Sequence, residues 1–256
     1  MRNILLLILG FFFCTGLFSQ ENATKNYWTD GTAYTVARHR LEIGIFTGSR
    51  YGLTDDLELS THSLISFLAL KLSVKKSWGE YGGFRIATEH GVFYPTQFMR
   101  LVTQKGTGGL ISPEFTIPQL FAIDNRVLVS CKPVENTILT AHAGFTFALK
   151  SDKLDSRTTI DLPVFYPRLA MFYHQPEIDL GIDFQGKIYK RFGFIFDVEN
   201  YLLPGSSKNY FLENSGILTY TSKKQSLRIE AGCKLCWGKY PSGNQWNLLP
   251  LIAVIF

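Results

Sequence analysis

The chain has 256 residues, a length that suits one large β domain, and a formal net charge of +5. Charged residues make up 18% of it and aromatic residues 14%, whereas about 25% of a soluble domain is charged, so this composition can hardly build an ordinary soluble surface. The mild positive charge, with no basic block among aromatic residues, indicates no nucleic-acid partner.

Residues 1–19 predict a secretory signal peptide. Arg2 supplies a short positive region, and residues 4–13 form the apolar stretch that follows it. We expect cleavage after Ser19, although Leu17 is larger than the small residue preferred three positions before the cut, which leaves the exact bond open. No later run reaches the 18 or so apolar residues of a transmembrane helix, so the sequence predicts an exported protein without a helical anchor.

We expect residues 20–37 to form a periplasmic N-terminal tail, loose at least as far as residue 31, and residues 38–256 to form a single β domain. Apolar and polar side chains alternate with a period of two over residues 137–150 and 177–187, among others. These stretches run about 10 to 14 residues, whereas ordinary strands average about 5–6 and a tilted membrane-spanning strand needs about 9–11. The sequence therefore predicts an antiparallel transmembrane β-barrel. The alternative is a soluble exported β-sandwich or a lipocalin-like cup, whose apolar faces would point inward.

Short and long connections alternate along the chain, as in outer-membrane barrels with short periplasmic turns and longer outer loops. The short turns carry Gly, Pro, Asn, Asp or charged residues, and the long connections include residues 94–118, 151–175, 204–214 and 238–245. This arrangement predicts about twelve strands, and ten is the alternative because the two strands around Arg50 are short. The predicted strands are residues 38–46, 49–54, 57–63, 67–78, 82–93, 119–132, 137–149, 176–189, 191–203, 215–222, 226–237 and 246–256.

Two segments resemble known families. Residues 50–60, R-Y-G-L-T-D-D-L-E-L-S, together with residues 41–46, resemble the opening hairpins of uncharacterised, transporter-like outer-membrane barrels of Gram-negative bacteria. Residues 246–256, W-N-L-L-P-L-I-A-V-I-F, resemble the closing strand of outer-membrane barrels, which carries a C-terminal Phe. The second resemblance implies that Phe256 acts as an assembly signal read by the barrel-assembly machinery, in a protein embedded in outer-membrane lipid.

Few residues suggest chemistry. Cys131, Cys233 and Cys236 remain after cleavage, and Cys233 and Cys236 would point to opposite faces of a strand, so no metal site is expected. Ser60 and His62 place a hydroxyl beside an imidazole, as a hydrolase requires, but their spacing does not match that of outer-membrane lipid hydrolases. A lumen histidine in a polar network is the preferred interpretation of His62. We therefore predict no enzyme activity and no cofactor.

If the apolar faces meet lipid, the opposite faces bring charges into the lumen. The densest acidic group comes from two neighbouring strands and comprises Glu177, Asp179, Asp183, Asp197 and Glu199. A wet lumen tolerates this acidic excess and favours cations, whereas a dry lumen requires pairing, with Arg85 and Arg228 as the expected partners. We call these seven residues the predicted charge wall.

Three functions follow from this architecture, and the sequence ranks them. The first is a passive channel or transporter for small solutes with an acidic lumen wall. The second is a closed-lumen barrel with a structural or surface-interaction role. The third, an outer-membrane enzyme acting on lipid, rests only on Ser60 and His62.

Overall fold

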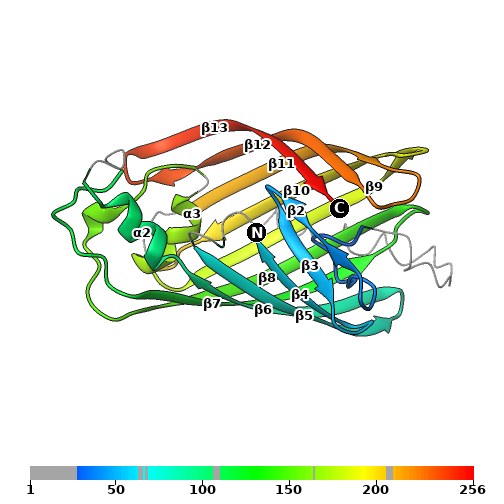
Figure 1. Ribbon diagram of the computed structural model, residues 1–256, viewed down its shortest axis with the longest axis horizontal. Helices are drawn as coiled ribbons and strands as arrows, with labels where there is room; N and C mark the ends of the chain where they lie inside the picture. The colour runs from blue at the N-terminus through cyan, green and yellow to red at the C-terminus, as the bar shows by residue number, and fades with distance from the viewer. Residues whose placement is uncertain (1–27, 63–65, 67–68, 106–109, 164, 206–209) are drawn as a thin grey trace, which may run out of the picture.

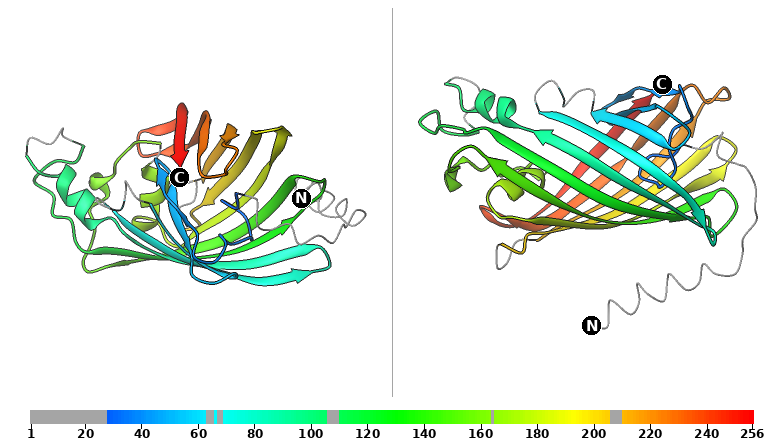
Figure 2. Two further views of the ribbon diagram at one scale, coloured as in Figure 1. Left: turned by 45° about the vertical axis from the view of Figure 1, so that its right-hand side comes forward. Right: turned by 90° about the horizontal axis from the view of Figure 1, so that it is seen from below.

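The computed structural model describes residues 28–256, apart from residues 63–65, 67–68, 106–109, 164 and 206–209. These residues form one antiparallel sheet that curls into a nearly closed barrel, with short helices at one end (Figure 1). The strands run obliquely to the long axis of the barrel (Figure 2). The predicted signal peptide and residues 20–27 of the predicted tail lie outside the described residues.

The sheet contains thirteen strands in the described part of the chain, in the order β1-β3-β4-β5-β6-β7-β8-β9-β10-β11-β12-β13-β2. The strands are β1 (Leu41–Glu42), β2 (Gly44–Ile45), β3 (Gly48–Gly52), β4 (Leu57–His62), β5 (Leu70–Tyr81), β6 (Phe84–Tyr94), β7 (Leu120–Cys131), β8 (Thr137–Lys150), β9 (Glu177–Tyr189), β10 (Phe192–Leu202), β11 (Tyr210–Thr221), β12 (Arg228–Tyr240) and β13 (Gly243–Ile255). The prediction of an all-β antiparallel barrel is confirmed.

The barrel closes where its first and last strands meet. β1 and β2 are two halves of the one strand predicted at residues 38–46: β1 pairs with β3, and β2 pairs with β13 through Ile45 and Gly44. Ile43 and Phe256 exchange two backbone hydrogen bonds of 3.0 Å beside that ladder. Counted with this strand as one unit, the twelve predicted strands are all present. The ladder to β2 takes up only the last residues of β13, so the closure is narrow.

Several strand boundaries differ from the sequence prediction, and two of these differences change the connections. β11 begins at Tyr210 rather than at residue 215, because the polar residues Glu213 and Asn214 continue a strand instead of interrupting it. The long outer loop expected at residues 238–245 is wrong, since Tyr240 pairs with Gly243 in a tight hairpin between β12 and β13. Gly243 adopts a φ of +122°, which a residue with a side chain rarely adopts and which permits this turn. The brief loop predicted near Ser63 lies outside the described residues.

Apolar side chains point outward and most charged ones point inward. Leu218 and Ile252 are 64% and 65% exposed, whereas Glu213 and Glu230 are 1% and 7% exposed. On the five adjoining strands β7 to β11, none of the outward positions that the structure describes carries a formal charge. This orientation is the reverse of the one that a soluble sandwich or cup needs, so the soluble alternative is wrong.

The helices lie in the long connections at one end of the barrel. They are α2 (Thr96–Val102), α3 (Tyr166–Leu169) and the two 3-10 turns η4 (Ser156–Thr158) and η5 (Ala170–Phe172). Met99 of α2 and Phe172 of η5 are fully buried in an apolar cluster that also includes Leu120 at the start of β7. We call this end the loop end, and the opposite end, where the short turns lie, the turn end.

None of the helices in the described residues is both long enough and apolar enough to cross a membrane.

Candidate functional site: the barrel interior

The N-terminal segment, residues 28–38, packs inside the barrel rather than forming a loose tail. Thr32 and Ala33 are completely buried in it, and Val36 is 2% exposed. A chain that enters the barrel needs hydrogen-bond partners there for its backbone N–H and C=O groups. The segment finds these partners on the polar inner wall. The expectation of looseness for residues 28–31 is therefore wrong, because a polar composition suits a polar lumen as well as it suits solvent.

Four wall side chains hold this segment through its backbone. The Ala33 amide donates to the Ser130 hydroxyl at 2.8 Å, and the Val36 amide donates to the Glu58 carboxylate at 2.8 Å. Lys75 Nζ donates to the Thr32 carbonyl at 3.2 Å, and Gln185 Nε2 donates to the Asp30 carbonyl at 2.9 Å. These donors and acceptors come from strands on both sides of the barrel, so the segment crosses the lumen.

A buried ionic cluster surrounds Arg50 next to this segment. Arg50 bonds to the carboxylate of Glu42, and its guanidinium lies 4.0 Å from Glu58 and 3.8 Å from Asp30 of the N-terminal segment. Lys75 Nζ lies 3.2 Å from the same Glu58 oxygen that faces Arg50. Each buried charge thus has an opposite partner, as burial requires. The opening hairpins are therefore fastened to the segment inside them.

A second ionic layer, here called the central layer, crosses the middle of the barrel. Arg126 of β7 places Nε 2.9 Å from Asp179 and Nη2 2.8 Å from Glu199. His142 of β8 lies 3.2 Å from Asp183 through Nδ1 and 3.4 Å from Glu199 through Nε2. Four strands, β7 to β10, are tied together by these contacts.

Two glycines on the inner face make the central layer possible. Gly144 stands between Arg126 and Asp179 in the strand register, and a Cβ there would lie 2.4 Å from the Asp179 carboxylate. A Cβ on Gly181 would lie 2.3 Å from His142 Nε2. Side chains on either side can therefore lie flat across these strands and reach partners two strands away.

The third ionic group joins the wall to α3. Arg168 of α3 donates to both carboxylate oxygens of Glu213, at 2.7 and 2.9 Å, and Lys234 donates to the same carboxylate at 2.8 Å. Around it, α3 packs Tyr166 into an aromatic cluster, 5.5 Å between ring centroids from Phe211. Burial, and after it the Asp161 carboxylate, raise the pKa of Tyr166 to about 12, so this hydroxyl stays neutral.

The acidic members of the predicted charge wall all lie on the inner face of β9 and β10. Asp179, Asp183 and Glu199 join the central layer, Asp197 bonds to Ser215 of β11, and Glu177 lies at the loop-end border of β9. The strand register places Asp183 directly opposite Asp197. The wall as a functional unit stays a prediction.

The expected basic partners of that wall are wrong. Arg85 lies 4.0 Å from Glu80 and donates to Ser77, and Arg228 lies 2.8 Å from Glu230 on its own strand. Arg126 and His142 take the expected role, because their strands, β7 and β8, lie two strands and one strand away from β9, whereas the strands of Arg85 and Arg228 lie three strands away. A sequence signal for them was present: inward glycines in strands 137–149 and 176–189 leave room for long side chains to cross.

Residues considered for other chemistry lie apart from one another. Cys236 is buried and Cys233 exposed, on opposite faces of β12 as expected, and the three cysteines that the structure describes are free thiols. Ser60 and His62 stand on β4, on the same face as Glu58. Ligand atoms of His142, Asp179 and Glu199 lie within 4.8 Å of one another, but the Arg126 guanidinium already bonds both carboxylates and supplies their counter-charge.

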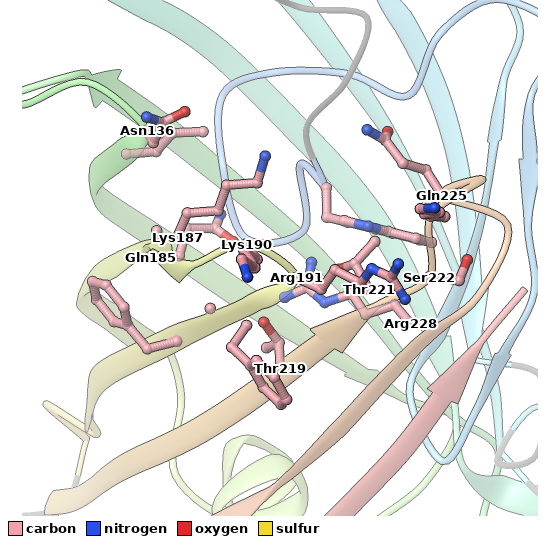
Figure 3. A pocket seen from close by; sticks show the side chains of 17 residues that line it. Asn136, Gln185, Lys187, Lys190, Arg191, Thr219, Thr221, Ser222, Gln225 and Arg228 are labelled. Carbon is pink, nitrogen blue, oxygen red and sulfur yellow. The ribbon is translucent and has the colours of Figure 1, made fainter.

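Two cavities remain within the described part of the barrel. One, of about 110 Å³, lies between α3 and the central layer and is lined by Arg126, Arg168, Glu177 and Asp179, among others. The other, of about 250 Å³, lies at the turn end beside Trp28 (Figure 3). The smaller cavity is bordered by Arg126 and Asp179 of the central layer, and the larger one by Trp28 of the N-terminal segment.

Comparisons with known proteins give a likeness of fold. Neither the family models nor the curated proteins match the chain. Among solved structures, the outer membrane channel DcaP of Acinetobacter baumannii has 9% identity and a TM-score of 0.38, with 93% of this chain and 66% of that chain covered. A bacterial polysaccharide outer membrane secretin has 9% identity and a TM-score of 0.44, covering 84% and 69%. OccAB4 of A. baumannii has 13% identity and a TM-score of 0.40, covering 82% and 51%.

The chain spans about half to two thirds of the length of these structures. At such low identities and TM-scores, the likeness carries no argument about what this protein binds or moves.

Proposed function

We propose that this protein is an outer-membrane β-barrel that acts as a small-solute channel and is closed, in the conformation described, by the N-terminal segment and α3. The observation that supports a membrane location is the uncharged outer face of β7 to β11, since lipid accepts such a surface and water does not. The secretory signal predicted at residues 1–19 would export the chain, and the outer membrane is where exported barrels of this kind insert.

Aromatic side chains border this apolar face at both ends. Tyr210, Trp237 and Trp246 gather towards the loop end, and Tyr189 and Tyr220 towards the turn end. On β12, Trp237 lies eight residues beyond Ile229, the residue that pairs with Tyr220, which corresponds to roughly 26 Å of strand. At a tilt of about 40° that length gives roughly 20 Å of height, close to the apolar band of about 25 Å in such barrels.

The way in which the lumen is closed favours a channel over a permanently closed barrel. The N-terminal segment is held mainly by hydrogen bonds from polar wall residues, which water can replace once the segment leaves. α3 is held by one bidentate ion pair and one aromatic cluster. Neither closure requires a strand to unpair.

Planar-bilayer recordings test the channel. The wild type is expected to stay mostly closed, and a variant whose residues 28–37 are replaced by a Gly/Ser linker of equal length, combined with Arg168→Gln, is expected to give discrete conductance steps. Arg157→Gln, in an exposed ion pair of the same connection as α3, is the matched control for Arg168→Gln. If the linker variant folds and inserts yet never conducts, the closed-lumen structural barrel is the correct function.

The second candidate, a closed-lumen structural barrel, is supported by the central layer, which spans four strands without needing the N-terminal segment. If the channel opens, acidic residues outnumber basic ones on the inner faces of β9 and β10, so we expect a weak preference for cations. Reversal potentials in a salt gradient measure that preference, and Asp179→Asn with Asp197→Asn should reduce it. An anion-selective open channel would contradict an acidic lumen wall.

A further inference from the structure

The cavity of about 250 Å³ at the turn end has a lining unlike that of the rest of the lumen. It lies between the N-terminal segment, which contributes Trp28, and the turn-end halves of β9 to β12 (Figure 3). Its size is slightly below the range of about 300–1,000 Å³ typical of small-molecule sites, so it suits a small ligand or one group of a larger one.

Five cationic side chains line this cavity, and no carboxylate does so among the residues that the structure describes. The cations are Lys187, Lys190, Arg191, Lys223 and Arg228. Arg228 lies 2.8 Å from the Glu230 carboxylate, and Arg191 donates to the Tyr220 hydroxyl at 3.1 Å. Like charges gathered around one concavity raise the local concentration of anions.

Uncharged hydrogen-bonding groups complete the lining. The hydroxyls of Thr219, Thr221 and Ser222 border the cavity together with the amide of Gln185. A Cβ on Gly193 would lie 2.8 Å from the Thr219 hydroxyl, so the glycine leaves that hydroxyl accessible. The strand register also shifts between Phe192 and Gly193, and such bulges are frequent where a strand borders a binding site.

Trp28 of the N-terminal segment lines this cavity. The Arg228 guanidinium lies 5.5 Å from the centre of the Trp28 ring, and Arg40 lies 4.9 Å from it. Gln185, which also lines the cavity, donates to the Asp30 carbonyl at 2.9 Å. The carboxylates of the central layer, those of Asp179, Asp183 and Glu199, are not among the described residues that line the cavity.

From these observations we infer that the turn-end cavity binds a phosphate-bearing anion, either a free phosphate compound or the headgroup of an anionic phospholipid. Lys and Arg side chains with nearby hydroxyls are the groups that bind phosphate oxygens best, and several such donors converge here. The inference does not depend on whether the lumen conducts.

Two soluble probes distinguish the sources of the phosphate. Inorganic phosphate and dihexanoyl phosphatidylglycerol are titrated into the purified full-length barrel in a zwitterionic detergent, with dihexanoyl phosphatidylcholine as the lipid of zero net charge. Saturable binding of inorganic phosphate indicates a free phosphate compound. Binding of dihexanoyl phosphatidylglycerol without binding of inorganic phosphate indicates a lipid headgroup. Binding of neither anion, or equal binding of both lipids, would overturn the inference.

A pair of neighbouring lysines provides the matched variants. Lys223 lines the cavity, and Lys224, which is also exposed and lies in the same turn, does not. Lys187→Gln with Lys223→Gln should weaken binding of the anionic probe about tenfold or more, since two charge-assisted bonds are lost. Lys224→Gln should leave binding within about twofold of the wild type. Equal weakening by Lys223→Gln and Lys224→Gln would show general surface charge and overturn the site.

Discussion

Replacing Arg126 with Gln should destabilise the barrel strongly, because this one guanidinium neutralises two carboxylates, Asp179 and Glu199. Removing one partner of a buried ion pair costs about 3–5 kcal/mol. The Arg126 side chain is 30% exposed to the lumen cavity, so water relieves part of this cost and we expect about 2–4 kcal/mol. With a urea dependence of about 2–3 kcal/mol per molar, the unfolding midpoint should fall by roughly 1–2 M.

Tryptophan fluorescence of the barrel in detergent micelles, with heat-modifiable migration on gels as a second probe, measures this midpoint. The triple variant Arg126→Gln, Asp179→Asn and Glu199→Gln removes the uncompensated charges and should regain at least half of the lost stability. Arg157→Gln, which breaks an exposed loop pair, should leave the midpoint unchanged. A single variant as stable as the wild type, or a triple variant less stable than the single one, would refute the role of Arg126.

Two further predictions concern a glycine and a loop carboxylate. Gly181→Ala should lower the free energy of unfolding by about 1–3 kcal/mol, because the added Cβ pushes His142 out of place. Gly216→Ala should cost much less, because its Cβ would meet an outward aromatic ring at 3.2 Å. Urea unfolding compares the two variants, and equal costs would contradict the steric argument. Arg157 lowers the pKa of Asp155 to about 2, so the ion pair should contribute fully to folding stability above about pH 4 and be lost as the pH falls through 2. Carboxyl NMR chemical shifts of Asp155 follow this titration, and a midpoint near pH 4 would contradict the prediction.

The architecture was predictable because each membrane-spanning strand carries its own period-two pattern. Residues 177–187, for example, place Ile178, Leu180 and Ile182 outward with Asp179 and Gly181 between them, and the structure places β9 there. The twelve-strand count followed from the turns. The hairpin between β12 and β13 was missed because Lys239 and Asn244 are polar on the outer face, where alternation no longer distinguishes strand from loop.

The interior was less predictable, because its partners are far apart in sequence. Arg126 and Glu199 are separated by 73 residues, and only the strand register brings them together. Asp124, Asn125 and Arg126 are three consecutive polar residues, so the pattern does not show which of them faces inward. The N-terminal segment carries no periodicity, and its place in the lumen depends on backbone hydrogen bonds that no side-chain pattern encodes.

The central claim is that the apolar face of the sheet meets lipid and the charged face encloses the lumen. Spin labels placed one at a time along β10, residues 192–202, in the protein reconstituted into liposomes test it through accessibility to oxygen. We predict a period of two, with high accessibility at the positions of Phe194, Phe196 and Val198 and low accessibility at Asp197 and Glu199. The opposite phase, or accessibility without a period, would contradict the account.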